Sequence, residues 1–147
     1  MKIFLLDVNV LVALLWPKHA QHAAAGKWFE KNRKHGWATC PFTEAGFVRI
    51  TSNPAFSIHS LRPTEAMKLL RENTEAEDHQ FWPADFEVEA LNLRFGARMV
   101  SHQNVTDAYL LTLAIKRGGM LATFDTGIRK LFEDDDAFRK SVEVITG

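Results

Sequence analysis

The sequence predicts an α/β fold: a three-layer α/β/α sandwich around a central, mainly parallel β-sheet. Short apolar runs, typical of strands buried on both faces, alternate with longer segments whose apolar residues recur at helical spacing. This alternation favours parallel strands joined by helices that cover both faces of the sheet. The 147 residues contain no internal repeat, low-complexity segment or long linker, so we expect residues 1–147 to form one domain.

The first strand is predicted at residues 3–6, which are all apolar. Residues 9–16 favour a helix that ends before Pro17, because proline cannot continue the hydrogen bonding of a helix. Residues 19–34 place alanine and aromatic side chains on one stripe, which is typical of an amphipathic helix, and Gly36 follows its end.

The second strand is predicted at residues 37–40, where the sequence reads "WATC". A helix over residues 43–52 is expected to follow, introduced by Pro41 and stopped by Pro54. The segment "RPTEAMKLLREN", residues 62–73, carries a proline at its start and apolar residues beyond it, and this pattern indicates another helix.

The middle of the chain begins with a charged loop at residues 75–78 and a short strand at 79–82. Residues 85–95 predict a helix closed by a glycine, and residues 98–100 predict an extended turn or short strand.

The last third of the chain predicts one long helix, residues 105–117, which a pair of glycines terminates. Residues 120–124 and 142–145 predict the final two strands. Between them, "EDDDAF" at residues 133–138 indicates a solvated acidic turn rather than a second metal site.

Composition excludes some classes of protein. The 18 basic residues balance the 18 acidic ones, so a domain that binds nucleic acid by charge alone is not indicated. Cys40 has no partner for an internal disulfide, which favours a reducing cytoplasm. Lys2 and the apolar run after it mimic a signal peptide, but Asp7 and Asn9 interrupt that run. We expect an unprocessed, soluble, cytoplasmic protein without a membrane span.

Asp7 is the least expected residue of the opening segment. It stands within an apolar run, where a buried and unpaired carboxylate costs several kcal/mol or becomes neutral. Asp7 therefore needs a partner or a function.

Four carboxylates are predicted to meet at one edge of the sheet. Asp7 and Asp125 each follow a strand, and Glu44 and Asp107 open helices. Ligands of such sheets bind outside the carboxyl ends of the strands. Glu44 and Asp107 also head the apolar stripes of their helices, so both point toward the core side.

Four clustered carboxylates would raise one another's pKa unless a cation held them, and an oxygen donor set favours Mg²⁺ or Mn²⁺ over zinc. Each residue also has a simpler interpretation. Asp107 and Glu44 are compatible with acids favoured in the first turn of a helix, and Asp125 with a plain Asp-Thr-Gly turn. Asp7 has the weakest alternative, because nothing local explains it.

The segments "LLDVNVLVAL", "TEAGFVRI", "VTDAYLLTLA" and "LATFD" resemble, in order and spacing, the PIN domain and within it the VapC-type toxins. The resemblance spans nearly the whole chain. It implies a PIN-like fold and a metal-dependent endoribonuclease whose acidic quartet is Asp7, Glu44, Asp107 and Asp125. It also implies that Asn9 is the polar residue that supports the first aspartate.

The resemblance further implies roles for these residues. Asp7 and Asp107 are expected to bind Mg²⁺ (or Mn²⁺) directly, whereas Glu44 and Asp125 bind it through water or orient the nucleophile. Thr123 matches the family's usual threonine. Phe124 departs from the basic residue that many relatives carry before the last aspartate, so Asp125 matches the family pattern less closely than the other three acids.

Four basic residues are candidates for holding RNA phosphates: Lys18, Arg49, Lys116 and Arg129. Solvated surface charge is the alternative interpretation of each.

The resemblance also implies partners: an RNA substrate, a second copy in a homodimer, and a small cognate antitoxin. The helices at residues 19–34 and 43–52 are candidate walls for an antitoxin helix, and an antitoxin arginine could reach the acidic site.

Two other classes remain open from the residues alone. A haloacid-dehalogenase-like phosphatase would use "DVN" as its Asp-x-Asp nucleophile, but Asn9 stands where the second acid is needed. A non-catalytic PIN-like binding module would have no physical reason to keep four clustered carboxylates.

Overall fold

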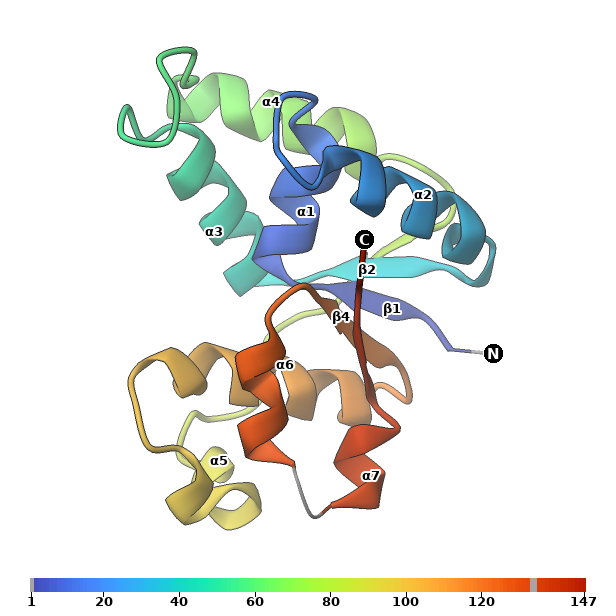
Figure 1. Cartoon of the computed structure of the whole chain (residues 1–147), viewed down its shortest axis with the longest axis vertical. Coiled ribbons are helices and arrows are strands. Elements are labelled where there is room, and N and C mark those ends of the chain that lie inside the picture. The colour runs from blue at the N-terminus through green and yellow to red at the C-terminus, as the bar shows by residue number, and fades with distance from the viewer. Residues whose placement is uncertain (1, 133–134) are drawn as a thin grey trace.

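The computed structural model describes residues 2–132 and 135–147. Its sheet has five strands, all parallel, in the order β3-β2-β1-β4-β5, and lies between two layers of helices (Figure 1). The three-layer prediction is confirmed. Each strand falls within its predicted segment: β1 Phe4–Leu6, β2 Trp37–Thr39, β3 His79–Phe81, β4 Met120–Thr123 and β5 Val142–Val144.

One layer of helices covers the upper face of the sheet in Figure 1 and the other covers the lower face. The upper layer contains α1 Val8–Leu15, α2 His22–Asn32, the 3₁₀ turn η1 Arg33–His35, α3 Pro41–Thr51 and α4 Pro63–Thr74. The lower layer contains α5 Ala90–Arg94, α6 Gln103–Lys116 and α7 Asp136–Arg139, with the 3₁₀ turns η2 Gly96–Arg98 and η3 Thr126–Leu131.

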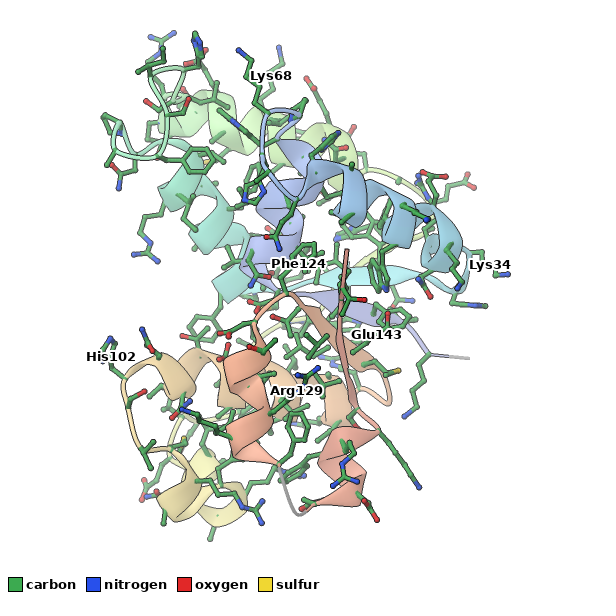
Figure 2. All side chains as sticks on the ribbon, in the orientation of Figure 1. Lys34, Lys68, His102, Phe124, Arg129 and Glu143 are labelled. Carbon is green, nitrogen blue, oxygen red and sulfur yellow. The ribbon has the colours of Figure 1, made fainter. Side chains whose placement is uncertain are left out.

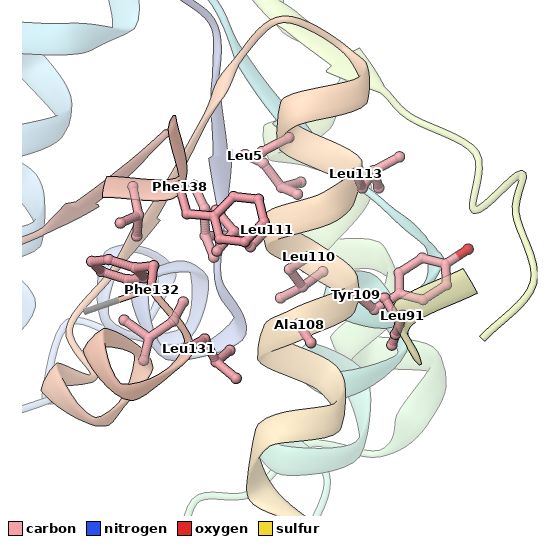
Figure 3. Packing of buried hydrophobic residues seen from close by; sticks show 14 of the residues in the cluster. Leu5, Leu91, Ala108, Tyr109, Leu110, Leu111, Leu113, Leu131, Phe132 and Phe138 are labelled. Atoms are coloured by element: carbon pink, nitrogen blue, oxygen red, sulfur yellow. The ribbon is translucent and has the colours of Figure 1, made fainter. Parts of the chain in front are cut away.

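Each strand contributes alternate side chains to two separate apolar cores. In β1, Phe4 and Leu6 pack in the core under α1 to α4, whereas Leu5 packs in the core of the α6 layer. Figure 3 shows Leu5, Leu131 and Phe138 beside α6 in that second core. A strand with both faces buried requires the uniformly apolar run from which β1 was predicted.

The predicted helix at residues 85–95 is shorter than expected. The structure forms α5 only over Ala90–Arg94. The Phe86 ring instead stacks on the Tyr109 ring with centroids 4.1 Å apart, and the Tyr109 hydroxyl donates to the Phe86 carbonyl at 2.8 Å. This contact with α6 gives Phe86 a non-helical position that local periodicity does not reveal.

Other boundaries shift for local reasons. α2 begins at His22, after a turn that follows Pro17. Residues 98–100 join no sheet, because Arg98 ends η2. Of the predicted acidic turn, residues 133–134 lie outside the described residues, and Asp135 caps α7 by accepting from two backbone N–H groups.

Where the structure describes the chain, its helices are all too short or too polar to cross a membrane.

Candidate active site and metal centre

Asp7 connects the end of β1 to the start of α1. It is 5% exposed and is the N-cap of α1: the Val8 N–H donates to its Oδ1 at 2.7 Å. The Thr123 hydroxyl donates to its Oδ2, also at 2.7 Å. Burial raises the pKa of Asp7, the two hydrogen bonds oppose that rise, and the charge of Asp125 adds to it. The carboxylate that interrupts the apolar opening segment therefore has partners.

Thr123 ties Asp7 to the turn after β4. It ends β4, which pairs with β1, and its side-chain oxygen accepts the Asp125 N–H at 3.0 Å. Asp125 is exposed, and its Oδ1 accepts the Gly127 N–H at 2.8 Å. The turn interpretation of Asp125 is thus correct for its backbone, and the same turn places the carboxylate close enough to affect Asp7.

Asn9 lies in the first turn of α1, and its side-chain oxygen accepts the Phe124 N–H at 3.4 Å. Phe124 packs against the core under α1 to α4. Asn9 therefore supports the end of β4 and with it the position of Asp125.

Asp107 lies in the second turn of α6, because that helix begins at Gln103 rather than at the predicted residue 105. It is half-buried. Burial raises its pKa to about 7, and the negative charges of Asp7 and Asp125 add to this effect. The structure therefore brings three of the four predicted carboxylates within electrostatic reach of one another.

Glu44 has different neighbours. It lies in the first turn of α3, and its Oε2 accepts the Thr39 hydroxyl at 2.6 Å. The Thr39 oxygen is also 2.8 Å from Nε2 of His79. In the described ranges, no three acidic, histidine or cysteine side chains are placed to hold one metal ion together. Glu44 thus lies at the predicted edge of the sheet but is held by Thr39.

Two hollows open beside the aspartates. One, of about 280 Å³, is lined by Asp7, Thr43, Arg49 and Thr106 among others. The second, of about 200 Å³, is lined by Asp107, Asp125 and Lys130 among others. Each hollow therefore combines at least one aspartate with a basic side chain, which is an arrangement that suits a phosphate group next to a cation.

The candidate phosphate-binding residues separate into two pairs. Arg49 lines the hollow that contains Asp7, and Arg129 lies on η3, the turn that Asp125 caps (Figure 2). Lys116, at the C-terminal end of α6, pairs with Asp85 at 3.3 Å. Lys18 lies beyond the C-terminal end of α1, and Asp7 lies at its N-terminal end. The structure places the first pair by the aspartates and the second pair away from them.

Two groups of residues beside the site were not predicted from the sequence. Lys130, five positions after Asp125, shares the hollow of Asp107 and Asp125. Thr39 and His79 contact Glu44 directly or through one residue. A basic residue close after the last aspartate was a signal for Lys130, whereas the pairing of β2 with β3 that brings His79 to Thr39 is a tertiary feature.

The donor set is compatible with a hard divalent cation. All the carboxylate oxygens are hard ligands, and no described histidine or cysteine joins them as a ligand set. Burial raises the pKa of Asp107 most, and the negative charges of Asp7 and Asp125 raise it further. Asp7 and Asp107 are the residues on which a bound cation would relieve that repulsion.

Comparison with known proteins gives consistent matches. The PIN domain family model matches residues 4–133. Ribonuclease VapC39 of Mycobacterium tuberculosis is 43% identical over 96% of this chain and 98% of its own length. Ribonuclease VapC38 of the same species is 40% identical, with 97% of both chains covered. The structure titled FitAcB, from Neisseria gonorrhoeae, superimposes with a TM-score of 0.60 over 95% of this chain and 96% of its own, at 20% identity.

The last of these matches supports the fold, and the family model and the two ribonucleases establish the family. Membership leaves no place for the haloacid-dehalogenase alternative. The chain belongs to the PIN-domain family and, within it, to the VapC group.

Proposed function

We propose that this chain is a divalent-metal-dependent endoribonuclease and the toxin of a toxin–antitoxin pair. The observation that carries the proposal is the cluster of Asp7, Asp107 and Asp125 at the carboxyl edge of a PIN-domain sheet, with the pKa of Asp107 raised to about 7. Relatives that match almost the whole chain are named ribonucleases, which supports RNA as the substrate.

The residues divide the work as follows. Asp7 and Asp107 would hold Mg²⁺ or Mn²⁺, and Asp125 and Glu44 would help to hold it or would orient the attacking water. When bound, the cation supplies charge neutralisation and lowers the pKa of a water molecule. Thr123 and the helix-capping contact with Val8 fix the Asp7 carboxylate in place.

Basic side chains at the two hollows position the RNA. Arg49 and Lys130 line the hollows that contain the aspartates, and Arg129 lies on the same turn as Lys130. Guanidinium and ammonium groups bind phosphate oxygens without reading the base sequence, so these residues set the position of the RNA backbone at the site. Such contacts are local, consistent with a sequence whose total charge is zero.

The antitoxin partner is proposed to cover the apolar surface beside α3. Of the two helices expected to line a groove for the antitoxin, α2 packs against α1, and α3 packs against both α1 and α4. A hollow of about 600 Å³ lies between α3 and α4, lined by Val48, Met67 and Phe81 among others, with Glu44 at its edge. A helix laid there would end close to the acidic site. We place this pair in the cytoplasm, where the free and buried Cys40 stays reduced.

The test is cleavage of RNA by the purified chain with Mg²⁺ or Mn²⁺, with a chelator, and by Asp7→Asn. We expect cleavage only by the parent with metal. Asparagine keeps the helix-capping oxygen and the shape of the side chain, so the variant should fold. Asp85→Asn, a change at an exposed surface carboxylate, is the control and should cleave normally. Cleavage that persists in Asp7→Asn or in chelator contradicts the mechanism.

A further inference from the structure

Hydrogen bonds lead from Glu44 back to the edge strand β3. The Thr39 hydroxyl lies between two groups, 2.6 Å from Oε2 of Glu44 and 2.8 Å from Nε2 of His79. Thr39 is fully buried, so water does not compete for its hydroxyl. The three residues come from β2, α3 and β3 and meet only in the folded chain.

The direction of these bonds follows from the count of protons. A threonine hydroxyl has one proton, and an ionised carboxylate only accepts hydrogen bonds. The Thr39 hydroxyl therefore donates to Glu44, so Nε2 of His79 acts as the donor to the Thr39 oxygen, and the backbone of Thr74 is a second hydrogen-bond partner of the imidazole. The two hydrogen bonds therefore point in the same direction, from the imidazole to the hydroxyl and from the hydroxyl to the carboxylate. Each bond polarises the other in the same sense.

The imidazole of His79 packs beside the indole ring of Trp37. His79 and Trp37 are aligned in the register of β2 and β3, and their rings lie 4.6 Å apart. The Trp37 indole N–H donates to Asp78 at 3.0 Å, and the guanidinium of Arg33 donates to the same carboxylate at 2.8 Å. These contacts hold the Trp37 indole beside the imidazole, whose Nε2 lies 2.8 Å from the Thr39 oxygen.

We propose that His79 is a positioning residue of the nuclease site, which orients the Glu44 carboxylate through the Thr39 hydroxyl. The proposal rests on the proposed function, because it gives Glu44 a role in the reaction. His79 itself lines neither of the two hollows beside the aspartates. Its loss should therefore change kcat and the metal requirement and leave the KM for RNA unchanged.

The first experiment measures whether His79 and Glu44 are linked without using activity. A double-mutant cycle measures the Tm of the parent, His79→Phe, Glu44→Ala and the double variant. The same cycle is then repeated in chains that also carry Thr39→Val. Burial lowers the pKa of His79, and the charges of Glu44 and Asp78 and a hydrogen bond with the backbone of Thr74 only partly oppose this, so at about pH 8 the ring is neutral and direct charge coupling is absent. We expect shifts in Tm that depart from additivity by about 2 °C or more when Thr39 is present. In the Thr39→Val background, which lacks the hydroxyl, the shifts should be additive.

The second experiment measures catalysis. We expect Thr39→Val and His79→Phe each to lower kcat, or to raise the Mg²⁺ concentration for half-maximal cleavage, by about 10-fold, as for other groups that orient a metal-site carboxylate. Thr39→Ser keeps a hydroxyl and should restore the parent behaviour. Thr51→Val is the matched control, since Thr51 is also fully buried but lies at the C-terminal end of α3 and donates to the Phe47 carbonyl.

The outcomes separate the two proposals. No cleavage by the parent chain with any divalent metal rejects the proposed function. Cleavage by the parent together with unimpaired His79→Phe rejects the positioning role alone. Equal impairment by Thr39→Ser and Thr39→Val, or coupling that survives the loss of the hydroxyl, also overturns that role, because a packing effect would then explain the data.

Discussion

At the scale of single residues, the aspartates of the site differ in burial, in hydrogen bonding and in the charges near them. Asp7 is nearly fully buried but accepts two short hydrogen bonds, which offset part of the cost of burial. Asp107 is half-buried and meets the charges of Asp7 and Asp125. Asp107 is therefore the carboxyl group whose pKa, at about 7, reaches the neutral range.

This difference predicts a pH dependence of stability without metal. The pKa of Asp107 in the folded chain is about 7, above the ordinary 3.8, so between these values the folded chain holds a proton that the unfolded chain has lost. Folding then takes up a proton, and stability falls as pH rises through this window. In chelator, Asp107→Asn should raise the Tm at about pH 8. It should also make the Tm depend less on pH between about pH 4 and 7.

Thermal unfolding across that range, with and without Mg²⁺, measures the effect. Mg²⁺ should stabilise the parent, because a ligand of the folded state adds stability, and should stabilise Asp107→Asn much less. Asp136→Asn, an exposed change in α7, is the control and should keep the parent's pH slope. If Tm depended on pH in the same way in Asp107→Asn and in the parent, the raised pKa would not belong to Asp107.

At the scale of elements, the site depends on how closely α3 approaches α1. Gly46 of α3 faces Val8, the residue after Asp7: a Cβ at position 46 would lie 2.8 Å from Cγ2 of Val8. Real Cβ atoms essentially never come so close, so any larger side chain separates the two helices or displaces Val8. The glycine in "TEAGFVRI" is thus explained by packing next to the site.

Gly46→Ala should therefore destabilise the chain by about 1–3 kcal/mol and reduce RNA cleavage, because Asp7 moves with Val8. Gly26→Ala is the matched control: a Cβ there meets nothing within 4 Å, so the change should stabilise α2 by about 0.5–1 kcal/mol. Denaturant unfolding measures both variants. Adding Val8→Ala to Gly46→Ala should recover stability, and a failure to recover would refute the steric explanation.

At the scale of the whole molecule, apolar side chains remain exposed on the surface formed by α5, α6 and the start of α3. Phe42 is 44% exposed, Val105 is 41% exposed and Leu93 is 95% exposed. The Phe42 ring contacts Tyr109 of α6 with centroids 4.8 Å apart, so the start of α3 packs against α6. Exposed apolar surface of this kind favours a protein partner.

We expect the free chain to be a homodimer that uses this surface. Light scattering should give twice the mass of one chain for the parent and the mass of one chain for Leu93→Asp. Ile58→Asp, an equally exposed change in the loop between α3 and α4, should leave the dimer intact. A monomeric parent, or a Leu93→Asp variant that stays dimeric, would show that this surface has another use.

The sequence alone determined the order of strands and helices and the places where Asp7, Asp107 and Asp125 stand. Apolar runs of strand length and helical periodicity are local patterns, and the carboxyl ends of parallel strands share an edge whatever the details of packing. The fold class followed from these rules, and so did the expectation that four carboxylates meet, of which the structure brings Asp7, Asp107 and Asp125 within electrostatic reach of one another.

Only the tertiary structure decided the surroundings of Glu44 and the shortened α5. Glu44 depends on the pairing of β2 with β3, which brings His79 to Thr39, and α5 depends on the stacking of Phe86 on Tyr109. These contacts join residues far apart in the sequence, and their side-chain orientations are chosen by packing and hydrogen-bond satisfaction in the folded chain. Local periodicity carries no information about such choices.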